Sequence, residues 1–100
     1  MEKVKVAIPK QKLEEFCRRH HIRRLAFFGS VLRDDFGPES DVDVLVEFEE
    51  GHTPGFAFIT IQDELSTLLG GRRVDLVTPK FLNHRIRERA LREAQVAYAV

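Results

Sequence analysis

Two aspartates separated by a single valine are the residues of this sequence best suited to chemistry. Asp41 and Asp43 begin a run in which valines alternate with other residues, Asp41-Val42-Asp43-Val44-Leu45-Val46. A period of two with this much valine predicts a strand. Side chains two positions apart on a strand share a face, about 7 Å apart at the backbone. Both carboxylates should therefore face one cleft.

Two carboxylates at one end of a strand are unfavourable without a partner. At a separation of about 5 Å and an effective dielectric constant of about 20, the pair repels by about 3 kcal/mol. A raised pKa or a bound cation relieves this repulsion. Hard oxygen ligands with open positions suit Mg²⁺, which is commonly held by one or two carboxylates together with substrate phosphates.

A Gly-Ser pair precedes the aspartates, and ten residues separate Ser30 from Asp41. Gly29-Ser30 ends a short apolar run, Leu25-Ala26-Phe27-Phe28, and we expect a helix to begin at Ser30 or just after it. Glycine lets a backbone approach a ligand closely, and free N–H groups at a helix start bind anions. The pair therefore predicts a phosphate-binding turn, distinct from a Walker A loop because Gly-Lys-Ser/Thr is absent.

Arg33 lies one helical turn beyond Ser30 and could reach a phosphate. The alternative is a surface arginine paired with Asp34 or Asp35, and the sequence leaves both interpretations open.

Asp75 is the third candidate carboxylate. Its apolar neighbours predict a buried position, where an unpaired carboxylate is costly. One interpretation is a salt bridge to Arg72, Arg73 or another arginine. The interpretation we favour is a third metal ligand beside Asp41 and Asp43 on a neighbouring strand.

The elements that would position these residues follow from hydrophobic periodicity. We expect strands at about 22–28, 41–48 and 72–79, and helices from Pro9, over 31–35, over 56–69 and over 81–94. The segment 95–100 could be an edge strand or an interface tail. This order describes a small α/β domain.

Bulk composition narrows the class of protein. One hundred residues suit one domain, 1–100. Sixteen basic and sixteen acidic residues give a net charge of zero, which disfavours a dedicated nucleic-acid binder. No apolar run approaches the length of a membrane span, about 20 residues, and no signal peptide is visible. The single cysteine, Cys17, excludes an internal disulfide and fits a reducing cytoplasm.

Together the Gly29-Ser30 pair, the ten-residue spacer and Asp41-Val42-Asp43 resemble the signature of the DNA polymerase β-like nucleotidyltransferases. The surrounding sequence is similar to the minimal nucleotidyltransferases, from about Leu25 to the end. The resemblance implies a polymerase β palm-like core (α+β), a mixed sheet with helices mainly on one face and the acidic site on the other.

That resemblance also implies roles for the residues. Two Mg²⁺ ions would be held by Asp41, Asp43 and Asp75, and the phosphates of a nucleoside triphosphate, expected to be ATP, by Gly29, Ser30 and Arg33. A nucleoside monophosphate would pass to an acceptor hydroxyl as pyrophosphate leaves. The family's third acidic residue lies on a later strand, where Asp75 is the well-placed candidate.

The acceptor is expected to come from a partner or from a second copy of the chain, because the sequence ends after the nucleotide-binding core. By resemblance, minimal nucleotidyltransferases pair with a helical HEPN-domain protein as a toxin–antitoxin module, and can add AMP to a tyrosine of the toxin. Two alternatives remain open: a binding module that neutralises a partner without turnover, and nucleotide transfer to a small molecule such as an aminoglycoside.

Overall fold

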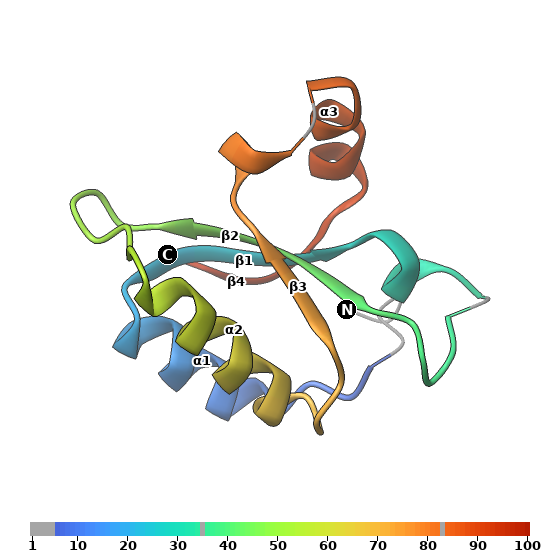
Figure 1. Cartoon of the computed structure of the whole chain (residues 1–100), viewed down its shortest axis with the longest axis horizontal. Coiled ribbons are helices and arrows are strands. Elements are labelled where there is room, and N and C mark those ends of the chain that lie inside the picture. The colour runs from blue at the N-terminus through green and yellow to red at the C-terminus, as the bar shows by residue number, and fades with distance from the viewer. Residues whose placement is uncertain (1–5, 35, 83) are drawn as a thin grey trace.

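The computed structural model describes residues 6–34, 36–82 and 84–100, which form helices and strands around a mixed sheet (Figure 1). In chain order the elements are α1 (Lys10–Arg19), β1 (Ile22–Phe28), the 3-10 helix η1 (Gly29–Leu32), β2 (Val42–Phe48), α2 (Ala57–Leu68), β3 (Val74–Val77), the 3-10 helix η2 (Pro79–Phe81), α3 (His84–Glu93) and β4 (Gln95–Ala99).

The strand order in the sheet is β3-β2-β1-β4. β1 runs antiparallel to β2 and to β4, whereas β2 and β3 are parallel. The register sets Asp43 opposite Phe28 on one side and opposite Asp75 on the other. The sheet therefore brings the end of β1, the start of β2 and β3 together at one place.

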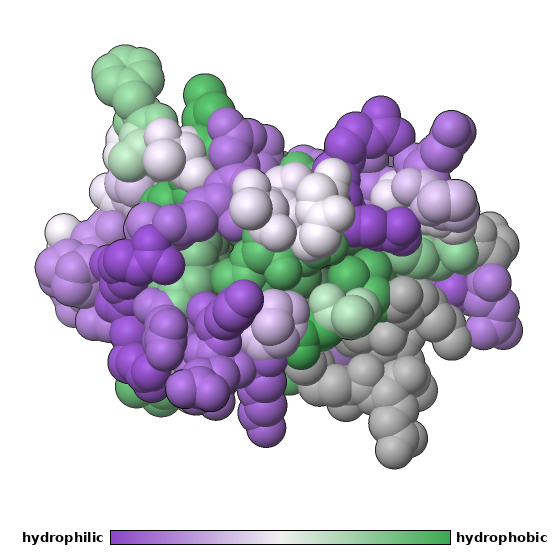
Figure 2. Space-filling model, turned by 90° about the horizontal axis from the view of Figure 1, so that it is seen from below, coloured by the Kyte–Doolittle hydropathy of each residue, from purple (hydrophilic) through white to green (hydrophobic). Residues whose placement is uncertain are grey.

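α1 and α2 cover one face of the sheet (Figure 1). Alternate residues of β2 and β3 point into this main core, namely Val42, Val44, Val46, Val74 and Leu76, and they pack with Leu13, Phe16 and Cys17 of α1 and with Ile61 and Leu65 of α2. The valine alternation seen in the sequence is thus the inward-facing set of β2. Seen from this side, the surface is largely hydrophilic with an apolar band across its middle (Figure 2).

The opposite face carries α3, which lies across the sheet from α1 and α2 (Figure 1). A smaller cluster forms here from Leu45, Leu82 and Ala90, with Phe28 and Val77 packed against it. Since Leu45 and Asp43 are two residues apart on β2, they share this face. The expected mixed sheet with helices mainly on one face is confirmed, with α3 as the helix on the acidic side.

Two local expectations differ from the structure, and one open alternative is decided by it. The segment after Gly29 is a four-residue 3-10 helix ending at Leu32, not a helix over 31–35, and residue 35 lies outside the described part. The expected helix over 81–94 is replaced by η2 and α3, with residue 83 again outside it. The segment left open, 95–100, forms edge strand β4 beside β1.

None of the helices in the described ranges has both the length and the apolar character needed to cross a membrane.

Candidate active site

Asp43 and Gly29 form the centre of the candidate site. The pairing of Phe28 with Asp43 places the turn after β1 directly beside the Asp43 side chain. Gly29 has a φ of 71°, a left-handed conformation that favours glycine, and a β-carbon here would collide with Oδ2 of Asp43. The glycine is therefore required both by the backbone and by the carboxylate.

The pKa of Asp43 is raised above its ordinary value of 3.8. Burial is the largest cause, and the nearby carboxylates of Asp75 and Asp41 raise it further. A hydrogen bond from the Ser30 backbone N–H and the charge of Arg33 act in the opposite direction. Asp43 is thus a half-buried carboxylate whose ionised form is disfavoured by burial and by two neighbouring carboxylates, a setting that favours either a proton or a cation.

Ser30 connects the turn to both aspartates. Its backbone N–H donates to the carboxylate of Asp43, and its hydroxyl donates to the backbone oxygen of Asp41 at 2.9 Å. The expectation of a free N–H group for an anion is not met at Ser30, because its N–H and its hydroxyl both form hydrogen bonds within the site. Ser30 fixes the distance between the Gly-Ser turn and the Asp-Val-Asp segment.

Asp41 lies at the end of the loop before β2, and its side chain is 55% exposed. Its Oδ1 is 3.0 Å from Nε of Arg73, which lies just before β3. The sequence suggested Arg73 as a possible partner of Asp75, whereas the structure pairs it with Asp41. This difference arises because β2 and β3 are parallel, so the residues that precede them lie side by side.

Asp75 faces Asp43 across the parallel register but is exposed, so the expectation that it is buried is wrong. Its neighbours Val74 and Leu76 point into the main core. Asp75 itself points to the other side of an edge strand. An exposed carboxylate needs no buried partner, and it remains accessible to a ligand.

The three candidate carboxylates line two different hollows of the surface. Asp43 lines a hollow of about 240 Å³ with Gly29, Arg33 and α3 residues Arg89 and Glu93. Asp41 and Asp75 line another, of about 390 Å³, with Arg73 and residues of α2. The second hollow lies at the β3 edge, where Gln62 Oε1 accepts a hydrogen bond from the Leu76 N–H.

Arginines gather on the α3 side of Asp43. Arg33 lines the hollow of Asp43 and also an adjacent one of about 400 Å³, to which α3 contributes Arg92. These two arginines, together with Arg89, make this side of the site suitable for an anion. The distance from Ser30 in the sequence points to Arg33. The arginines of the last helix are spread around it, so the sequence offers them together as a group that could steer nucleotide and does not single out Arg89 and Arg92.

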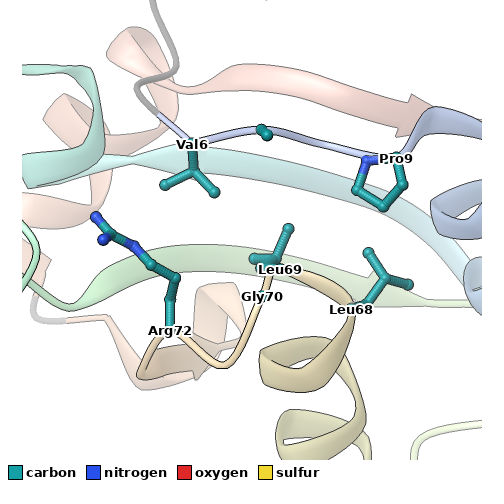
Figure 3. A pocket seen from close by; sticks show the side chains of 7 residues that line it. Val6, Pro9, Leu68, Leu69, Gly70 and Arg72 are labelled. Carbon is teal, nitrogen blue, oxygen red and sulfur yellow. The ribbon is translucent and has the colours of Figure 1, made fainter.

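Another hollow has a different character and lies away from the carboxylates. It is lined by Val6, Ala7, Pro9, Leu68, Leu69, Gly70 and Arg72, and Figure 3 shows mostly apolar side chains around it. None of the candidate site residues contributes to it.

The donor set fits a divalent cation in its chemistry: carboxylate oxygens, hard ligands, with a raised pKa at Asp43 caused partly by the other two. The three side chains are not gathered into one cage, however. Among the residues that the structure describes, no group of three His, Cys, Asp or Glu residues is close enough to hold a metal ion. The arrangement suits a cation that takes its remaining ligands from substrate phosphates.

Comparison with known proteins adds sequence relationships to this geometry. The Nucleotidyltransferase domain family matches residues 9–97. Protein adenylyltransferase MntA of Thermococcus cleftensis is 41% identical, with 80% of this chain and 79% of that protein covered. A Methanocaldococcus jannaschii protein, whose name assigns protein adenylyltransferase activity provisionally, is 30% identical over 82% of this chain and 90% of its own length.

Several solved structures have a fold similar to that of this chain. A chain described provisionally as a minimal nucleotidyltransferase superposes with a TM-score of 0.70 at 41% identity, covering 86% of each chain. A toxin–antitoxin structure with AMP-PNP gives 0.73 at 17% identity, covering 93% of this chain and 75% of that one. A complex of tri-AMPylated Shewanella oneidensis HEPN toxin with MNT antitoxin gives 0.64 at 17% identity, over 91% and 70%. The last two support the fold alone.

Proposed function

Because the chain belongs to the nucleotidyltransferase domain family, we propose that it transfers AMP from ATP to a hydroxyl group of a partner protein, with divalent metal bound by Asp41, Asp43 and Asp75. The single observation that carries this proposal is the environment of Asp43. A half-buried carboxylate with a raised pKa lies against the Gly29-Ser30 turn and pairs in register with Asp75. Such a carboxylate suits positive charge, and the turn beside it lines two surface hollows.

In the proposed reaction, one bond to the α-phosphorus forms and another breaks. The acceptor oxygen attacks the α-phosphorus of ATP, the bond from that phosphorus to the bridging oxygen breaks, and pyrophosphate leaves with the bonding electrons. The hydroxyl proton passes to a carboxylate, for which the exposed side chain of Asp75 is the accessible candidate. Bound Mg²⁺, expected as two ions, would supply charge stabilisation at the phosphates.

Arginines on the α3 side would receive the negative charge of the triphosphate. Arg33 is exposed and lines both hollows beside Gly29, so its guanidinium can reach an anion placed on either side of that turn. A charge-assisted hydrogen bond from a guanidinium to phosphate is among the stronger polar contacts in proteins. Arg33 would orient the phosphates, and Gly29 would allow them to approach the backbone.

For the partner, we propose a helical HEPN-type toxin, with this chain as the antitoxin of the module. The support comes from the relatives: one bears the name protein adenylyltransferase, and a similarly folded chain occurs in a complex with an AMPylated HEPN toxin. The accepting group would be a tyrosine hydroxyl of that partner.

Labelled ATP tests the transfer directly. The chain is mixed with its cognate partner, Mg²⁺ and ATP labelled in the α-phosphate, and label on the partner is followed with and without chelator. We expect Mg²⁺-dependent labelling that disappears in Asp43→Asn, while the variant still binds the partner. Labelling that never appears, with partner binding intact, would instead establish a neutralising module without turnover.

A calorimetric titration isolates the nucleotide step. ATP is added to wild type and to Asp43→Asn, with Mg²⁺ or with chelator. Metal-dependent heat in wild type alone supports the site. Label transferred to a small hydroxyl compound instead of a protein would redirect the proposal to small-molecule nucleotidyl transfer.

A further inference from the structure

Two consecutive arginines before β3 hold the loop that leads to Asp41. Arg72 Nη2 donates to the Gly37 backbone oxygen at 3.1 Å, and its guanidinium lies 4.5 Å above the Phe36 ring. Arg73 Nη2 donates to the Glu39 backbone oxygen at 2.6 Å. Arg72 and Arg73 therefore hold the loop at Gly37 and at Glu39, although more than thirty positions separate them from it in the sequence.

Arg73 acts on Asp41 from two directions. Its backbone oxygen accepts a hydrogen bond from the Val42 N–H at 2.8 Å, which anchors the backbone just beyond Asp41. Its Nε approaches Oδ1 of Asp41 at 3.0 Å. The same guanidinium thus spans the Glu39 carbonyl and the Asp41 carboxylate. Nε of Arg73 therefore lies at an oxygen of Asp41 that a bound cation would need.

We propose that Arg73 is a positioning residue that withholds Asp41 from metal until nucleotide arrives. The Arg73 guanidinium lies against Oδ1 of Asp41, so it competes for this oxygen with any cation that Asp41 would bind. Loading of the site then requires Arg73 to release the carboxylate. This inference rests on the proposed function, because it concerns the order in which the same site is filled.

Competition follows from charge and geometry. A guanidinium and a divalent cation cannot both occupy Oδ1, and the two positive charges repel each other. The pair is solvent-exposed, at 74% for the Arg73 side chain and 55% for Asp41, so the effect is modest and reversible. A strong buried pair would block the site permanently, whereas an exposed one can be displaced by a cation that arrives with phosphates.

The test measures Mn²⁺ binding without nucleotide, by electron paramagnetic resonance of free Mn²⁺, in wild type and Arg73→Gln. We expect Arg73→Gln to bind Mn²⁺ about two- to fivefold more tightly, in keeping with the strength of surface ion pairs. Arg73→Lys keeps the charge and should stay near wild type. In an Asp41→Asn background, Arg73→Gln should change nothing, because the carboxylate in dispute is gone.

Arg23→Gln provides the matched control. Arg23 Nη2 lies 3.0 Å from Oε1 of Glu47, an exposed ion pair at the far end of β2. Removing this guanidinium changes the net charge by the same amount as Arg73→Gln but leaves Asp41 untouched, so Mn²⁺ affinity should stay at the wild-type value. Equal tightening in Arg23→Gln and Arg73→Gln would overturn the inference, as would unchanged or weaker binding in Arg73→Gln.

ATP binding in the same samples separates the two proposals. If wild type binds ATP with Mn²⁺ while Arg73→Gln and wild type bind Mn²⁺ equally, only the role of Arg73 is refuted. If wild type binds neither Mn²⁺ nor ATP with Mn²⁺, the proposed function fails and the role of Arg73 fails with it.

Discussion

Gly29 lies so close to Asp43 that a β-carbon at position 29 would overlap Oδ2 of the carboxylate. The contact follows from the antiparallel register, in which the last residue of β1, Phe28, is the partner of Asp43. The Gly-Ser pair and the second aspartate of the Asp-Val-Asp segment, fourteen positions apart in the numbering, are thus in direct contact in the fold.

Gly29→Ala should destabilise the protein and remove nucleotide binding. The left-handed backbone and the collision with Asp43 together should cost about 1–3 kcal/mol of unfolding free energy. Gly51→Ala is the matched control, because Gly51 has a φ of 80° with nothing near the added β-carbon. Urea unfolding of both variants separates strain from collision; equal losses would show that the contact with Asp43 has no energetic effect.

Asp43→Asn should leave the protein without metal as stable as wild type or more stable. Burial and neighbouring carboxylates raise the pKa of Asp43, so its ionised form is a cost to the folded state. That cost is absent well below the ordinary pKa and is fully present above the raised pKa. The advantage of Asp43→Asn in thermal melts with chelator should therefore grow as pH rises from the acid range toward neutrality. An unfolded variant would instead identify Asp43 as a structural hydrogen-bond acceptor.

Arg33→Gln should weaken ATP binding by about tenfold, the scale of one lost hydrogen bond from a charged group. The reason is that Arg33 lines both hollows next to Gly29. Arg18→Gln removes an exposed guanidinium from α1 and serves as the charge control. Calorimetry with Mg²⁺ measures both variants, and equal affinities would return Arg33 to the role of a surface arginine.

Glu64 of α2, which pairs with Arg19 and His20 at the end of α1, should make the stability of the protein depend on pH. Burial alone would raise the pKa of Glu64, but hydrogen bonds from Arg19 and His20 and their charges outweigh it and lower the pKa. A lowered pKa means that the ionised form stabilises the fold above the ordinary pKa, and that this contribution disappears as pH falls through the folded value.

Glu64→Gln should therefore be less stable than wild type at neutral pH, with a difference that shrinks in acid. Because the Glu64 side chain is 35% exposed, the loss should be small, about 0.5 kcal/mol or less. Urea unfolding at several pH values measures it, and Glu15→Gln, at an exposed position of α1, is the control. A difference that widens in acid would contradict the assignment.

Most elements could be predicted from hydrophobic pattern. The valine alternation of β2 and the apolar stripe of α2 each mark one buried face, and these patterns predict the bounds of both elements to within a residue or two. The last helix was placed less well because Pro79 begins a separate 3-10 turn, which the periodicity of the following residues conceals. The sequence leaves the segment 95–100 ambiguous. Its conformation is determined by pairing with one neighbouring strand at the sheet edge, and a local sequence pattern does not reveal that pairing.

Side-chain pairing in the site could not be predicted in the same way. Asp75 has apolar neighbours in sequence, but only the strand order shows that β3 lies at the edge and leaves this residue exposed. Arg73 lies two positions from Asp75 in sequence, yet the parallel register of β2 and β3 makes Asp41 its ion-pair partner. The arginines of α3 are spread around a helix, and only its position on the sheet selects Arg89 and Arg92.

The chemical groups and their spacing can be predicted from the amino-acid sequence: two aspartates on one face of a strand, a glycine-serine turn, and a third aspartate on a later strand. These are local properties, set by the period of a strand and by the conformations open to each residue type. Which charged side chains meet is visible only in the folded chain, because contacts between distant segments depend on strand order and register. In the fold, Gly29 lies against the Asp43 carboxylate, Ser30 donates hydrogen bonds to Asp43 and Asp41, and Arg73 forms an ion pair with Asp41.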